Sequence, residues 1–274
     1  MNSVKFKSFS SGSSGNCYFL GVFSEDVFCL GGILIDTGVS PRRVKRELAS
    51  DSLGHDAYSA ILITHDHHDH IGSLGSYCKH LKKPVWATEK LHRAMSRRYT
   101  SGPCLADCRR ILSDGWNEIV PGLIRARYFE VPHDATQTLG YAIEADSHRF
   151  VIMTDIGAMT PQALSYALQA DTLVIESNYD LRMLEEGPYP EELKERIRGG
   201  NGHLSNTECA DAIRRTMHEG LRNIFLCHLS EHNNTPQTAL GESRAVLDAL
   251  EGSYSKLPRL SPLPHTGASP LYTL

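Results

Sequence analysis

Apolar and polar positions alternate along the chain in a way that predicts many short strands and helices. Apolar or alternating runs bounded by Gly, Ser or Asp predict strands, and capped segments predict helices. Ser40 followed by Pro41 marks the start of one helix, and Thr88 and Ser205 are expected to cap two others. The expected strands are residues 4–9, 17–22, 32–35, 60–63, 85–87, 123–131, 139–144, 149–153, 172–175 and 223–227. The expected helices are residues 41–48, 71–81, 89–98, 161–168, 191–197, 205–217 and 236–250.

The chain reads as one domain covering residues 1–274, because neither an internal repeat nor a typical linker interrupts it. A Ser- and Gly-rich stretch, residues 10–16, is expected to be a loop between the first two strands. Residues 256–274 form a C-terminal extension that contains several prolines, and its end, residues 270–274, could add an edge strand.

Composition is that of an ordinary globular protein, with 41% apolar and 22% charged residues. Residues 1–6 lack the apolar core of a signal peptide, and no apolar run approaches the roughly 18 residues of a membrane span. Seven cysteines, an odd number, fit a reducing compartment, so we expect a cytoplasmic protein without membrane attachment. The net charge of −4 excludes a general attraction to nucleic acid, which a local patch or a metal would have to supply.

The run from Thr64 to His70 contains four histidines and two aspartates directly after an apolar strand. In an extended segment the side chains of His65, His67 and Asp69 point the same way. Imidazole and carboxylate are ligands that borderline divalent metals accept. The run therefore predicts a metal site, and the alternation and the preceding strand disfavour a merely solvated polar loop.

Three later residues share one placement, a polar ligand at the end of an apolar strand. His133 follows residues 129–132, Asp155 follows residues 150–154, and His228 follows residues 224–227. Strand ends are where binding groups converge in layered α/β folds. One such residue alone would be a weak signal, but all three in order after the histidine run form a specific pattern.

This ordered set resembles that of the metallo-β-lactamase-fold hydrolases, over roughly residues 4–250. The resemblance implies an α/β fold, a four-layer αββα sandwich with metals at the edge between two sheets. It implies one metal held by His65, His67 and His133, and another held by Asp69, His70 and His228. Asp155 would bridge the two metals, His68 would be no ligand, and Asp36 of the Asp36-Thr37-Gly38 turn would orient a ligand loop.

Two divalent cations, Zn²⁺ or Mn²⁺ or else Fe²⁺, are the expected cofactors. Cations about 3.5–4 Å apart can share a water molecule, convert it to hydroxide and polarise the bond under attack. The expected activity is therefore metal-dependent hydrolysis through a metal-bridging hydroxide.

Chain length separates this sequence from several branches of the family. Only 46 residues follow His228, too few for the helical domain of glyoxalase-II-like thioesterases, and 72 residues between Asp155 and His228 leave no room for a β-CASP insertion. Residues 10–17, 173–180, 202–206 and 228–234 resemble the bacterial YycJ/WalJ-type subgroup. That resemblance implies a 5′→3′ exonuclease that acts on DNA, with a role in DNA repair.

The candidate catalytic residues are Asp69 and His203, the latter before a helix N-terminus and similar to a histidine of tRNase Z. His203 could instead only cap the helix. The same metals could also serve a small-molecule hydrolase that cleaves a lactone, thioester or cyclic phosphodiester. The complete ligand set disfavours a non-catalytic protein.

The candidate substrate-binding or supporting residues are Asp36, Ser14, Asn16, Glu176, Ser230 and Asn233. Small basic groups that could contact a nucleic-acid backbone are residues 42–46, 82–83, 93–98 and 194–198.

Overall fold

The structure, a computed structural model, describes residues 2–274, in which the strands form two sheets of seven strands each. The first sheet has the order β14-β1-β2-β3-β4-β5-β6, and the second has the order β13-β12-β11-β10-β9-β8-β7. The first sheet contains β1 (Asn2–Gly12), β2 (Gly15–Ser24), β3 (Phe28–Ile35), β4 (Ala60–Leu62), β5 (Val85–Ala87), β6 (Arg109–Ile111) and β14 (Tyr272–Thr273). The second contains β7 (Asn117–Val120), β8 (Ile124–Val131), β9 (Thr138–Ala145), β10 (His148–Met153), β11 (Thr172–Glu176), β12 (Asn223–Cys227) and β13 (Arg259–Pro262).

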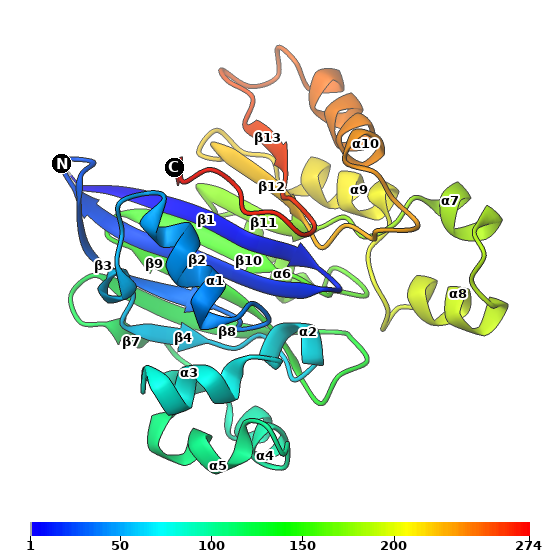
Figure 1. Cartoon of the computed structure of the whole chain (residues 1–274). Coiled ribbons are helices and arrows are strands. Elements are labelled where there is room, and N and C mark those ends of the chain that lie inside the picture. The colour runs from blue at the N-terminus through cyan, green and yellow to red at the C-terminus, as the bar shows by residue number, and fades with distance from the viewer. Residues whose placement is uncertain (1) are drawn as a thin grey trace.

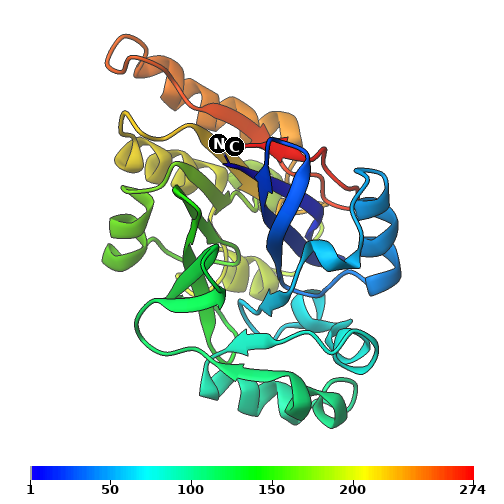
Figure 2. The same ribbon diagram turned by 90° about the vertical axis from the view of Figure 1, so that its left-hand side faces the viewer.

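Helices cover the outer faces of both sheets, which gives the four layers expected of an αββα sandwich (Figures 1 and 2). Apolar side chains of α1, α3 and α4 belong to the cluster of the first sheet, and those of α6, α9 and α10 pack on the second. The expected α/β class is therefore confirmed. The helices are α1 (Pro41–Ala49), α2 (His68–Ile71), α3 (Leu74–His80), α4 (Glu89–Ser96), α5 (Gly102–Leu105), α6 (Pro161–Ala167), α7 (Leu181–Glu186), α8 (Glu191–Arg198), α9 (Asn206–Thr216) and α10 (Pro236–Ala249).

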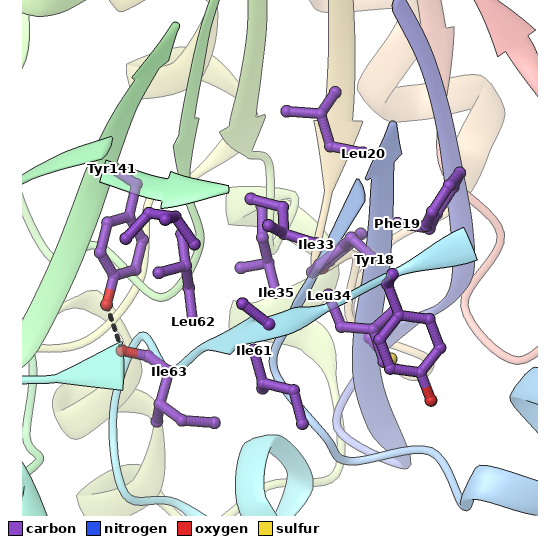
Figure 3. Packing of buried hydrophobic residues seen from close by; sticks show 14 of the residues in the cluster. Tyr18, Phe19, Leu20, Ile33, Leu34, Ile35, Ile61, Leu62, Ile63 and Tyr141 are labelled. Atoms are coloured by element: carbon purple, nitrogen blue, oxygen red, sulfur yellow. Dashed lines mark hydrogen bonds between the residues drawn. The ribbon is translucent and has the colours of Figure 1, made fainter. Parts of the chain in front are cut away.

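The inner faces of the two sheets pack through large apolar side chains. The Phe6 ring of β1 lies 5.2 Å from that of Phe150 and 5.1 Å from that of Phe225, which both belong to the second sheet. The buried Tyr141 hydroxyl of β9 donates a hydrogen bond of 2.6 Å to the carbonyl oxygen of Ile63, just after β4 (Figure 3). This contact joins the sheets directly behind the predicted metal site.

The capping residues take the positions that the sequence predicts. Ser40, Thr88 and Ser205 each accept a hydrogen bond from a main-chain N–H in the first turn of α1, α4 and α9. At α9 the bond is reciprocal, because Glu208 in turn accepts from the Ser205 main-chain N–H.

Two expected elements differ from the structure. The expected helix 71–81 is wrong at its start, because α2 begins at His68 and a break precedes α3. The break occurs where the Ser73 N–H donates to the Thr37 carbonyl oxygen rather than continuing the helix. The expected loop 10–16 is wrong in extent, because β1 and β2 continue to a tight turn and Gly15 adopts a φ of +151°.

The C-terminal segment crosses back to the start of the chain. Strand β14 pairs with β1 at the edge of the first sheet, and β13 pairs with β12 in the second. The assignment of the whole chain to a single domain stays a prediction. In residues 2–274, no helix has both the length and the apolar character needed to cross a membrane.

Candidate metal centre

The histidine run after β4 divides between a loop and a helical turn. His65 and His67 lie in the loop, whereas Asp69 and His70 lie on α2. The expectation that His65, His67 and Asp69 point the same way is therefore wrong, because the backbone turns helical at His68. Asp69 consequently groups with His70 and not with His65.

The first group of possible metal ligands consists of His65, His67 and His133, one donor atom of each lying within 4.8 Å of the others. The three ring centroids lie 4.8 to 5.2 Å apart. His133 follows β8, and its Nδ1 donates a hydrogen bond of 2.9 Å to the Gly202 carbonyl oxygen. That bond orients the ring and leaves Nε2 free to face the group.

The second group consists of Asp69, His70 and His228, again with donor atoms within 4.8 Å of one another. Asp69 Oδ2 lies 3.4 Å from Nε2 of His70 and 3.7 Å from Nε2 of His228. His228 follows β12, so this group joins α2 beside the first sheet to a strand end of the second.

Asp155, which follows β10, lies between the two groups. Its Oδ2 is 3.1 Å from Nε2 of His70, and its Oδ1 is 3.7 Å from Nε2 of His133 and 3.4 Å from Nδ1 of His228. The seven residues expected as ligands thus converge on one region, with the carboxylate in the middle.

Glu176 at the end of β11 supports the part of the site that comes from the second sheet. Its Oε1 accepts hydrogen bonds of 2.8 Å from Nδ1 of both His203 and His228. Its Oε2 accepts from the main-chain N–H groups of Ile156, at 2.9 Å, and Leu204, at 3.1 Å. A single buried carboxylate therefore positions two imidazole rings and two chain segments.

Asp36 has the corresponding role at the end of β3. Its carboxylate accepts from Nδ1 of His70 at 2.7 Å, and from the N–H and the hydroxyl of Thr64 at 2.8 Å each. Two residues further along, a Cβ atom at Gly38 would overlap the carbonyl oxygen of Asp69. The Asp36-Thr37-Gly38 turn therefore orients His70 and lets α2 approach the sheet closely.

Three residues of the site adopt the left-handed backbone region that non-glycine residues rarely use. The φ angles are +62° at Asp36, +48° at Asp155 and +53° at His228. Asp36 and His228 directly follow a strand and Asp155 lies two residues after one, and such strain persists only where the surrounding structure holds it. Main-chain bonds hold His228, whose N–H donates to Ser11 Oγ at 2.9 Å and whose carbonyl accepts from Asn178 at 2.8 Å.

Burial and neighbouring charge shift the pKa values of the site in opposite directions. Burial and the adjacent His70 hold the pKa of His65 well below its ordinary value, so this ring is neutral. Burial opposes charge on Asp155, but the histidines His228 and His70 outweigh it and hold its pKa well below the ordinary range. For His228, Asp155 and Asp69 outweigh burial and raise the pKa to about 10.

The donor set fits divalent metal ions. Nε2 of His65, Oδ2 of Asp155 and Nε2 of His228 are buried, and none has a hydrogen-bond partner in residues 2–274. Buried polar atoms are normally paired, so three such atoms in one cluster indicate a ligand. Imidazole nitrogens and carboxylate oxygens are the donors that zinc and similar cations accept.

The other predicted residues divide between the site and its surroundings. Asn16 lies at the site, and its Nδ2 is 3.0 Å from Asp69 Oδ2 and 2.8 Å from His70 Nε2. Ser230 lines a cavity beside His203, and Ser14 is exposed at the tip of the β1–β2 turn. The side-chain oxygen of Asn233 lies toward Gly187, and its expected place at the site stays a prediction.

Sequence reasoning missed Ser11 and Asn178 as supports of His228. Both lie in stretches that the sequence singled out, the Ser/Gly run and the segment after β11. Ser11 contacts a residue 217 positions away, and Asn178 one 50 positions away. Neither contact has a local signal in the sequence.

Comparisons with known proteins agree with this arrangement. The family model described as "Beta-lactamase superfamily domain" matches residues 32–228. "Exodeoxyribonuclease WalJ" of Streptococcus pneumoniae is 33% identical over 235 residues, which cover 86% of this chain and 85% of that protein. "Exodeoxyribonuclease YycJ" of Bacillus anthracis is 31% identical over 245 residues, 89% of each protein.

A solved structure supports the fold independently. The metallo-β-lactamase fold protein YhfI from Bacillus subtilis matches with a TM-score of 0.68 at 14% identity. The match covers 97% of this chain and 99% of that one. The resemblance noted from the motif is therefore confirmed for the family and for the fold.

Proposed function

The chain belongs to the beta-lactamase superfamily, and we propose that it is a dinuclear metal-dependent phosphodiesterase that degrades DNA as a 5′→3′ exonuclease. The observation that supports hydrolysis is the pair of donor groups with Asp155 between them, in which three buried donor atoms lack a hydrogen-bond partner in residues 2–274. The DNA substrate is supported by relatives named exodeoxyribonucleases that align over most of the chain.

In this proposal His65, His67 and His133 would hold one ion, and Asp69, His70 and His228 the other, with Asp155 between them. Divalent metal ions such as Zn²⁺ or Mn²⁺ bound there would acidify a water molecule and polarise the phosphodiester group. Asp69 contributes through the second ion, to which its carboxylate would bind.

His203 is the candidate proton donor to the leaving oxygen. Its Nδ1 is engaged by Glu176 at 2.8 Å, and its ring lines the cavity beside the site. Nε2 is therefore the atom that can carry a proton toward a substrate. Glu176 fixes the orientation of this ring as well as that of His228.

The first experiment compares substrate classes. Protein loaded with Mn²⁺ or Zn²⁺ is incubated with 5′-labelled single- and double-stranded DNA, and in parallel with thioester and lactone substrates. We expect nucleotides to be released from the DNA, starting at the 5′ end. Turnover of a thioester or lactone without any DNA cleavage would overturn the nuclease proposal in favour of a small-molecule hydrolase.

A second experiment isolates His203. His203→Ala should lower DNA turnover by on the order of 10²-fold while the metal content stays that of the wild type. His80→Ala, at an exposed histidine on α3, is the matched control and should leave both quantities unchanged. Loss of metal in His203→Ala would show that this residue is a ligand or a structural support.

A further inference from the structure

A cavity of about 220 Å³ opens directly beside the candidate metal centre. One wall comes from the α7–α8 segment, residues 181–198, which projects from the body of the molecule in Figure 1. The opposite wall contains His203 and His228, so whatever fills the cavity lies against the reacting groups. The lining residues are Ser13, Asp134, Asn178, Tyr189, Leu193, Arg196, Ile197, Gly202, His203, His228, Leu229 and Ser230.

Helix α8 presents one face to this cavity. Leu193, Arg196 and Ile197 are spaced by three and four residues and therefore lie on the same side of the helix. Tyr189, just before the helix, adds an aromatic ring to the same wall. A hydrogen bond of 2.6 Å from the buried Lys194 ammonium group to the Glu185 carbonyl oxygen holds α8 against α7.

A positive charge lies at the rim of the cavity. The Arg196 guanidinium group pairs with the Asp134 carboxylate, which is itself 3.3 Å from Nε2 of His133. The Arg196 side chain is nevertheless 63% exposed. Part of its hydrogen-bonding capacity therefore remains accessible to a phosphate group that enters from solvent.

We propose that this cavity binds a single DNA nucleotide adjacent to the scissile phosphodiester. Tyr189, with Leu193 and Ile197, contacts the base, and Arg196 contacts a phosphate. This inference rests on the proposed nuclease function and assigns the residues that bind its substrate.

Two properties of the cavity favour this occupant. An aromatic ring beside an arginine is the combination that proteins use to bind an unstacked base together with its backbone. The volume lies below the roughly 300–1,000 Å³ of pockets for drug-sized ligands, which suits a single base. In this proposal the nucleotide leaves the base stack before its phosphodiester is cleaved.

The test for Tyr189 measures DNA binding without cleavage. Fluorescence anisotropy records the affinity of EDTA-treated protein for an oligonucleotide labelled at its 3′ end, and for the same strand with an abasic 5′-terminal residue. Tyr189→Ala should weaken binding of the intact strand by roughly tenfold and leave binding of the abasic strand unchanged. Tyr189→Phe, which keeps the ring, should bind both strands as the wild type does.

The test for Arg196 uses the dependence of affinity on salt. Arg196→Ala should reduce the slope of log affinity against log salt concentration by about 1, as the loss of one phosphate contact does. Arg214→Ala, which removes the guanidinium paired with Asp211 on α9, is the matched control and should leave the slope unchanged. Tyr99→Ala, at a residue that is 95% exposed, is the control for the tyrosine.

The outcomes separate the two proposals. If the wild type cleaves DNA but Tyr189→Ala weakens both strands equally, or neither, the nucleotide cavity is refuted and the nuclease proposal stands. An unchanged salt slope in Arg196→Ala refutes the phosphate contact. If the wild type neither binds nor cleaves DNA, the nuclease proposal itself fails.

Discussion

The two sheets contribute to the candidate metal centre in different ways. The first sheet supplies four of the seven expected ligands from one short run after β4, whereas the second supplies His133, Asp155 and His228 from the ends of separate strands. In the first case the chain itself brings the residues together. In the second sheet, the register of the strands and the Glu176 carboxylate must do so. Each half of the centre, meaning the ligands that one sheet supplies, is supported by a buried carboxylate, which is Asp36 in the first half and Glu176 in the second.

The largest effect is expected at the residue that both halves share. Asp155→Asn keeps the shape of the side chain but removes the charge that lies between the two donor groups. Turnover of 5′-labelled DNA should fall by on the order of 10³-fold. Asp211→Asn on the exposed face of α9 should leave turnover unchanged, and an active Asp155→Asn variant would contradict a common centre.

Substitutions of Asp36 and Glu176 test whether each half of the centre depends on its own supporting carboxylate. Glu176→Gln and Asp36→Asn should each lower metal affinity or turnover by about 10- to 100-fold, as loss of a hydrogen bond to a ligand does. Chelator competition measures the affinity. The effects of Glu176→Gln and His203→Ala on turnover should not be additive, because Glu176 bonds to the His203 ring as well as to the His228 ring. The effects of Asp36→Asn and His203→Ala should be additive.

Ser11→Ala breaks a contact between the halves. The His228 main-chain N–H loses its acceptor, and an unpaired buried donor costs about 1–3 kcal/mol of unfolding free energy. Urea denaturation measures the difference. Ser13→Ala at the exposed turn is the control, and equal stabilities of the two variants would show that Ser11 does not support His228.

The smallest effect is expected behind the site. Tyr141→Phe removes the bond to the Ile63 carbonyl and should cost about 1 kcal/mol, which lowers Tm by roughly 2–4 °C. Tyr128→Phe removes an exposed bond to Asp114 and should cost less. A larger loss in Tyr128→Phe would contradict the role of Tyr141 in joining the sheets.

The sequence predicts well what local patterns determine. The starts of α1, α4 and α9 follow from Ser40, Thr88 and Ser205, because a capping side chain bonds to N–H groups only three residues away. The family motif identified the seven residues that converge at the candidate metal centre, because these residues follow strands in a fixed order along the chain.

Contacts between distant segments could not be predicted. The turn of the backbone at His68 separates Asp69 from His65, although their spacing suggests a common direction. Helix α8 is predicted from its sequence, but which of its residues line the cavity depends on how the fold places the helix. Arg196 belongs to a basic group that the sequence already indicates, whereas Tyr189 becomes a candidate only when the fold brings it to the same cavity as His203.

The pairing of β14 with β1 has a consequence for the order in which the protein can form. Ser11, whose hydroxyl supports His228, also donates its main-chain N–H to the carbonyl oxygen of Pro264. In the pairing of β1 with β14, Lys5 lies opposite Thr273. During synthesis the first strand leaves the ribosome long before its edge neighbour exists. Contacts of such sequence separation form late and slowly. A nascent chain therefore carries all of its candidate ligands before β14 can close the edge of the sheet that holds several of them, so the candidate site is complete only after β14 has been synthesised.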